Sequence, residues 1–518
     1  MSPTSPLPPP IPVLEDYGLS PTTGFLPPTL PLTRLPDPYY NKWEAIAANL
    51  QAHVLSRRLR GVVDSLPVLS TVGLEHDAEW RRAYSLLCFI AHAYIWGGDA
   101  PADRLPASVS VPLLAIAARL EVPPVATYAA VCLWNFKPLF LDEPIDNLEN
   151  LATLNTFTGS IDESWFYLVS VAIEARGGPI LALMLTAFGA ARRDDARTVT
   201  RCLCAFAERL TDLTIIMQRL YESCEPATFY HRIRPFLAGS KNMAEAGLPR
   251  GVLYEDGSGT ETYRQYAGGS NAQSSLIQFF DIALGIHHRA TGETPATTTT
   301  TTGGGAAPPP PSSSTTTKHG HGFIHEMRKY MPAPHARFLE DATRAANLRE
   351  YVEAHRSDRA LCLAYDACLA MLSSFRDKHI SIVTRYIINP SREARARSRS
   401  RAAADDDAPA RKRINLATAS KIAPEKGGQR GTGGTALIPF LKQARDETSE
   451  PAVEEWTRRF MKRKMGSGGG GADFGGSGRV DMLLPQPAAA LDKENVVDVK
   501  GLAWSWTMED DVGGICMV

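Results

Sequence analysis

The chain lacks paired cysteines, a strong net charge and any apolar run long enough to span a bilayer. Its eight cysteines are scattered, with no CxxC pair, which favours reduced core thiols over a zinc site. A formal net charge of −1 gives no electrostatic reason to bind nucleic acid. The longest apolar run, GGPILALMLTAFGAA, is shorter than the ~20 residues of a membrane helix. The proline-rich N-terminus lacks the pattern of a secretory signal. We therefore expect a cytoplasmic protein that binds neither nucleic acid nor membrane.

What the chain has is helical periodicity. Hydrophobic residues make up 44% of 518 residues, enough for a large core, and no long run of alternating strands occurs. The sequence predicts an all-α fold with a small, mainly helical N-terminal domain at 1–157 and a large helical domain at 158–450. Ser160 and Glu163 form a capping-box pattern at the start of the second domain. Low-complexity text at 291–320 and 391–427 predicts insertions, and 451–518 predicts a disordered tail.

A histidine lies inside an apolar helical stripe at 361–389. Spacings of three and four residues place the following residues on one helix face: Leu361, Tyr365, Cys368, Leu372, Phe375, Ile382 and Tyr386. His379 occupies the next position of that face, and Asn389-Pro390 predicts the end of the helix. Taken alone, such a histidine is more often a hydrogen-bonded core residue than a ligand. The absence of a second ligand in the same helix argues against a non-haem metal site and leaves haem iron as the metal alternative.

Three other motifs could contribute to a site, although each has an ordinary structural explanation. Gly268-Gly269 before a helix allows close approach to a flat ligand, or is a simple loop and cap. Arg234 lies in a largely apolar segment, five residues after Phe229, and suits a carboxylate partner from the protein or from a ligand. The GTGGT run at 431–435 lacks the GK[ST] ending of a phosphate loop, which favours a mobile loop or lid that leads into a helix.

Together and in this order, these strings resemble the indoleamine 2,3-dioxygenase family. The resemblance covers roughly 10–290, 320–390 and 428–448 and includes LEDYGLSPTTGFLP, RKYMPAPHARFL and RALCLAYDAC. It implies a small helical domain followed by a large all-helical domain that holds haem b, with ferrous iron in the active form.

The resemblance also implies roles for individual residues. His379 would be the iron ligand, and the other cofactor-binding residues would be Arg376, Asp281, Ser270 and Gly269. Substrate would contact Tyr128, Phe166, Phe229, Arg234, Ser270 and Thr432. The catalytic positions would be Ser170, Phe229 and Arg234, with Ser170 a poor base at neutral pH. Val131 stands where some members carry a cysteine, which bears on substrate preference.

The activity implied is the opening of the indole ring of L-tryptophan by O2, which gives N-formylkynurenine. This would be the first step of the kynurenine route toward NAD, carried out by a monomer. The alternative on the same scaffold is a haem-binding or sensing protein with little turnover.

Overall fold

α-Helices dominate the computed structural model, which describes residues 8–260, 262–291, 322–402, 437–455, 457–459 and 461. The all-α prediction is confirmed, because the strands in these residues are only two or three residues long. One small sheet joins β1 (Arg104–Leu105), β4 (Val252–Tyr254) and β5 (Tyr263–Arg264), and a hairpin joins β2 (Phe136–Pro138) and β3 (Leu151–Thr153). The parallel pairing of β1 with β4 connects segments far apart in sequence.

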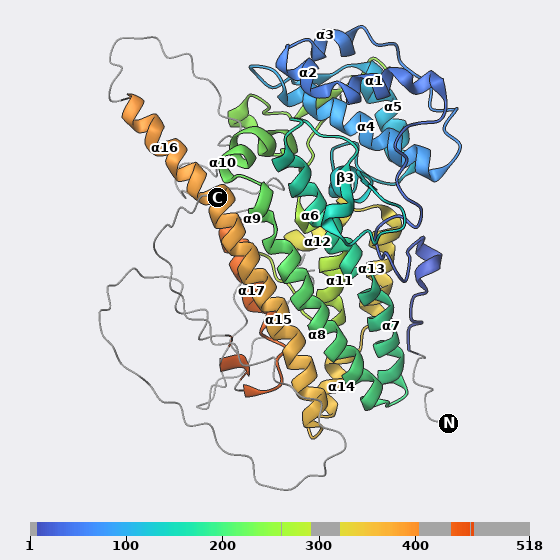
Figure 1. Cartoon of the computed structure of the whole chain (residues 1–518), viewed down its shortest axis with the longest axis vertical. Helices are drawn as coiled ribbons and strands as arrows, with labels where there is room; N and C mark the ends of the chain where they lie inside the picture. The colour runs from blue at the N-terminus through green and yellow to red at the C-terminus, as the bar shows by residue number, and fades with distance from the viewer. Residues whose placement is uncertain are drawn as a thin grey trace, which may run out of the picture. The chain divides into compact units, whose positions relative to one another are not determined.

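The N-terminal helices lie together at one end of the compact unit that spans Met1–Ser467 (Figure 1). They are α1 (Asn41–Ala48), α2 (Leu50–Leu55), α3 (Leu59–Asp64), α4 (Asp77–Trp96) and α5 (Ala107–Arg119). The chain before α1 is held by apolar contacts: Phe25 is buried, and its ring centroid lies 5.7 Å from that of Phe338. The domain boundary at residue 157 stays a prediction.

Long helices build the rest of this unit (Figure 1). They are α6 (Ile161–Gly177), α7 (Pro179–Arg192), α8 (Ala196–Gln218), α11 (Ser275–Ala283), α13 (Ala333–Ala345), α15 (Arg359–Val383), α16 (Asn389–Ala402) and α17 (Leu437–Thr448), with short helices α9 (Leu220–Ser223), α10 (Pro226–Thr228), α12 (Phe323–Met327) and α14 (Leu348–Ala354). Helix α15 packs along α8, which packs on α6 and α7. Every apolar residue of the predicted stripe is buried, so the periodicity identified the core face of α15.

The start of α6 follows the predicted cap. The Ser160 hydroxyl accepts from the Glu163 amide at 3.3 Å, but the Glu163 carboxylate reaches the amides of Phe157 and Thr158 instead of closing the box. By length and composition, 161–192 could cross a membrane, yet 67% of its most apolar window is buried in the protein. It is also two helices that meet at Gly178. A Cβ at residue 178 would lie 2.6 Å from the carbonyl carbon of Thr23. The N-terminal segment therefore passes so close to Gly178 that no side chain fits at this position.

Helix α15 does not end at Pro390 as predicted. A π-helical turn, η10 (Thr384–Ile388), follows it, and the chain continues as α16. Pro390 is then the second residue of a new helix, where the intrahelical ladder needs no amide hydrogen. The first part of the predicted 391–427 insertion is therefore helical, and the part beyond 402 lies outside the described residues, as does nearly all of 291–320.

The first residues of the segment predicted as a disordered tail make defined contacts. The amides of Val453 and Glu454 donate to the carboxylate of Asp366 on α15 at 2.9 and 3.0 Å, and Ala452 is buried. These contacts extend the packed part of the chain past residue 450, and residues beyond 461 lie outside the description.

Candidate active site

A deep cavity lies among α6, α11, α15 and α17. Its volume is about 270 Å³, whereas a cavity that holds one water needs only about 10–15 Å³. Every predicted site residue within the described chain lines it: Tyr128, Phe166, Ser170, Phe229, Arg234, Gly269, Ser270, Asp281, Arg376 and His379. Thr432 lies outside the described residues. The fold therefore brings residues that are more than 200 positions apart in the sequence to one cavity.

His379 belongs to α15, whose first turn is capped by the Asp358 carboxylate accepting from the Leu361 amide at 3.1 Å. Among the described residues its ring nitrogens have no hydrogen-bond partner, which argues against a role as a hydrogen-bonded core histidine. Burial, with the nearby charge of Arg376, lowers the pKa of His379 to about 4. The imidazole is thus neutral at pH 7, with a lone pair available to a metal.

Aromatic and aliphatic side chains form the cavity walls. Three π-helical turns supply several of them: η3 (Ala129–Leu133), η5 (Phe229–Ile233) and η10. The ring centroid of Phe229 lies 4.7 Å from Phe166 and 5.9 Å from Tyr386. Such turns recur at functional sites because the wider turn redirects side chains. Here they direct Val131, Phe229 and Tyr386 toward the cavity.

Arg234 places a positive charge in the wall of this apolar cavity. It starts the 3₁₀ turn η6 (Arg234–Leu237), is 4% exposed, and lies 5.7 Å from the ring centroid of Tyr230. Burial lowers the pKa of its guanidinium, but an arginine remains cationic at neutral pH. A planar cation on the wall of an apolar pocket suits a carboxylate on the ligand.

Glu174, on α6, does not line the cavity, but it hydrogen-bonds two residues that do, and sequence reasoning missed it. Its Oε1 accepts from the Tyr128 hydroxyl at 3.0 Å and from the Ser274 hydroxyl at 2.6 Å. Its Oε2 is buried without a partner among the described residues. Burial raises the pKa of Glu174 to about 7, against the lowering effect of both hydroxyls. Its position one turn after Ser170 in an apolar helix was the available signal.

The two glycines before α11 have different roles. A Cβ on Gly268 would lie 2.0 Å from the carbonyl oxygen of Leu237, so this glycine serves backbone packing rather than ligand approach. Gly269 lines the cavity. Gln273 fixes the loop by accepting from the Tyr128 amide at 2.8 Å and donating to the Gly268 carbonyl at 2.9 Å.

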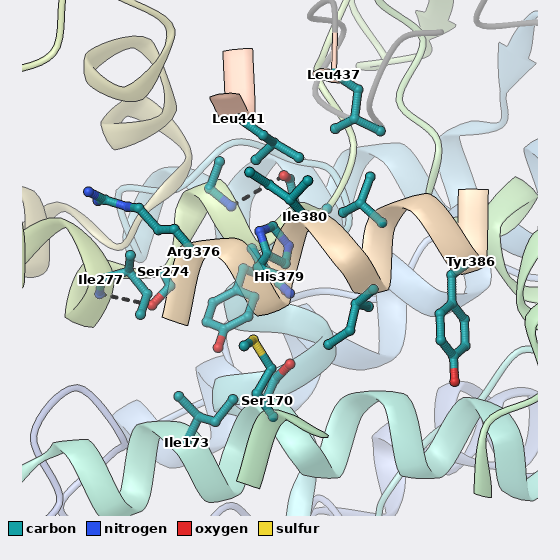
Figure 2. A pocket seen from close by; sticks show the side chains of 18 of the residues that line it. Ser170, Ile173, Ser274, Ile277, Arg376, His379, Ile380, Tyr386, Leu437 and Leu441 are labelled. Atoms are coloured by element: carbon teal, nitrogen blue, oxygen red, sulfur yellow. Dashed lines mark hydrogen bonds between the residues drawn. The ribbon is translucent and has the colours of Figure 1, made fainter. Parts of the chain in front are cut away.

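Helix α17 closes part of the cavity, which the sequence indicated only as a helix after a loop. It contributes Leu437, Phe440, Leu441 and Ala444. In the view of Figure 2, His379 lies between Leu441 above and Ser170 below.

These residues fit haem. The neutral imidazole suits iron, the apolar walls suit a flat macrocycle, and the lining also includes polar side chains such as Ser270 and Arg376. An all-helical fold around such a cavity suits the class of haem proteins.

Comparison with known proteins agrees with this class. The family model described as indoleamine 2,3-dioxygenase matches residues 13–451. The chain is 44% identical to an indoleamine 2,3-dioxygenase of Saccharomyces cerevisiae, over 85% of this chain and 93% of that protein. It is 36% identical to a 6-hydroxytryptophan 2,3-dioxygenase of Fusarium equiseti, over 84% and 97%, and 32% identical to indoleamine 2,3-dioxygenase 1 of Mus musculus, over 86% and 96%. The chain therefore belongs to the indoleamine 2,3-dioxygenase family and is a dioxygenase, which favours an enzyme over a haem sensor.

Proposed function

We propose that this enzyme opens the indole ring of L-tryptophan with O2, using haem b held by His379, and gives N-formylkynurenine. The observation that supports it is the gathering of Arg234, Phe166 and Phe229 in the cavity that His379 also lines. The cavity thus offers a cation for the amino acid's carboxylate, rings for its indole and a nitrogen for iron. When bound, ferrous haem supplies the site for O2 activation at the indole C2–C3 bond.

In this reaction the protein chiefly positions the substrate. Phe166, Phe229 and Tyr128 offer flat apolar contact to the indole, and Arg234 orients the molecule through its carboxylate. The C2–C3 bond breaks and both oxygen atoms stay in the product, so no proton or leaving group is lost overall. Ser170 therefore need not act as a base, for which its hydroxyl is poorly suited. Orientation within an apolar cavity is the contribution that the fold provides.

Preference for the indole ring's substituents is set by the cavity wall. The Fusarium relative is named for 6-hydroxytryptophan, so relatives of this fold differ in the ring they accept. Val131 and Cys132 line the wall here, and neither offers a strong hydrogen-bond partner to a ring hydroxyl. We propose a preference for the unsubstituted ring, consistent with a place at the first step of the kynurenine route toward NAD.

The test is an absorbance titration of the ferrous haem-loaded protein with L-tryptophan, then with 6-hydroxytryptophan, followed by product detection under O2. We expect a saturable spectral change and N-formylkynurenine from L-tryptophan, with lower kcat/KM for the hydroxylated substrate. Absence of product from the reduced protein would refute the proposed function. Size-exclusion chromatography and cell fractionation test the expected monomer and cytoplasmic location.

A further inference from the structure

A row of alternating charges is buried beside the cavity. Arg376 Nη2 lies 2.5 Å from Asp281 Oδ1, and His288 Nε2 lies 2.9 Å from Asp281 Oδ2. The other ring nitrogen, His288 Nδ1, lies 2.6 Å from Glu447 Oε2. Asp281, Glu447 and Arg376 are buried, and His288 is nearly so. The family resemblance implied roles for Arg376 and Asp281 but not for His288 or Glu447.

The geometry suits a protonated His288, because the pKa values of Asp281 and Glu447 are both lowered and both groups stay carboxylates. A neutral imidazole has one N–H, whereas both ring nitrogens here face carboxylate oxygens, so each must donate. Burial alone would lower the pKa of His288, but Asp281 and Glu447 outweigh it and raise the pKa. Besides Arg376, charged groups near the cluster are Arg289 beside His288, its partner Glu450, and Arg328 from η9 (Arg328–Tyr330).

This cluster holds α17 in place. Glu447 also accepts from the Arg289 backbone amide at 3.2 Å, outside α17, and from the side-chain amide of Gln443 in its own helix at 2.9 Å. Arg376 donates to the Ala444 carbonyl at 3.3 Å and to the Thr448 hydroxyl. Ala444 lies one turn before Glu447 and lines the cavity, so a movement at Glu447 is transmitted to the wall.

We propose that His288 is a positioning residue: its imidazolium, held between Asp281 of α11 and Glu447 of α17, clamps α17 as a wall of the active site. The proposal rests on the proposed function only for the identity of the substrate that the cavity holds. Loss of the proton leaves a lone pair facing a carboxylate and weakens the clamp. Because the pKa of His288 is raised above the ordinary 6.5, the clamp is fully present below pH 6.5 and is lost as pH rises through the folded-state value.

The test compares haem-loaded full-length wild type with His288→Gln, Glu447→Gln and the double variant, with His287→Gln as the matched control. His287 is the exposed neighbour. Hydrogen exchange of 437–448 and the pH profile of KM for L-tryptophan are measured. We expect His288→Gln to speed exchange in 437–448 at least about tenfold, the factor of one charge-assisted hydrogen bond. KM should rise more than kcat falls, and the control should match wild type.

Glu447→Gln is the milder change, because its amide oxygen can still accept from His288 while the charge is removed. It should shift the alkaline loosening of 437–448 to lower pH, and the double variant should be no worse than His288→Gln alone. Unchanged exchange and pH profile in both single variants, or fully additive effects in the double variant, would overturn the proposal. If wild type makes no N-formylkynurenine, the proposed function fails, while the exchange comparison still decides whether the clamp exists.

Discussion

The buried carboxyl of Glu174 makes stability depend on pH in a direction that can be measured. Its pKa rises from 4.5 to about 7 on folding, and each pKa unit corresponds to about 1.36 kcal/mol, so keeping this carboxylate charged and buried costs about 3 kcal/mol above pH 7. Below pH 4.5 both folded and unfolded states hold the proton, and the cost disappears. Between these values the unfolded state releases its proton first, and the free energy of unfolding falls as pH rises.

Glu174→Gln should remove this cost while keeping an oxygen to accept from Tyr128 and Ser274. The variant's advantage over wild type in free energy of unfolding should therefore grow by about 2–3 kcal/mol as the pH rises from 5 to 8. Urea unfolding at matched haem content measures this difference, with exposed Glu208→Gln on α8 as control. Infrared spectroscopy should show a protonated carboxyl band near pH 6 that Glu174→Gln lacks. Parallel stability curves for variant and wild type, with no such band, would refute the reasoning.

Four further results are expected. His379→Ala should lose the haem absorbance at matched protein concentration, whereas His355→Ala, a half-exposed histidine after α14, should keep it. Arg234→Leu should raise KM for L-tryptophan about 10- to 100-fold, the value of a hydrogen bond to a charged group, and a KM within twofold of wild type would contradict its role. Ser170→Ala should lower kcat less than about tenfold, because loss of a general base costs about 100-fold or more. Deleting the predicted insertion at 291–320 should leave haem content unchanged; loss of haem would show that the segment is needed.

The sequence determined the helices and the core face of α15. Apolar spacing identified the stripe, Ser160 and Ser274 start their helices as caps, and each of these signals acts within a few residues of the chain. Local signals misled at Pro390, because proline is compatible with the first turn of a new helix and a π-helical turn placed it there. On its pattern alone, His379 was also better explained as a core residue.

The tertiary structure decided what surrounds that histidine. Burial and partners are properties of neighbours that are distant in sequence, so only the fold shows that His379 lacks a partner among the described residues and that Glu174 is buried with one oxygen unsatisfied. The clamp is the clearest case. Asp281 and Glu447 are separated by more than 160 positions, and neither carries a local signal of pairing with His288. Charge pairing of this kind depends on packing, because a buried charge is tolerated only where the fold brings its counter-charge to it.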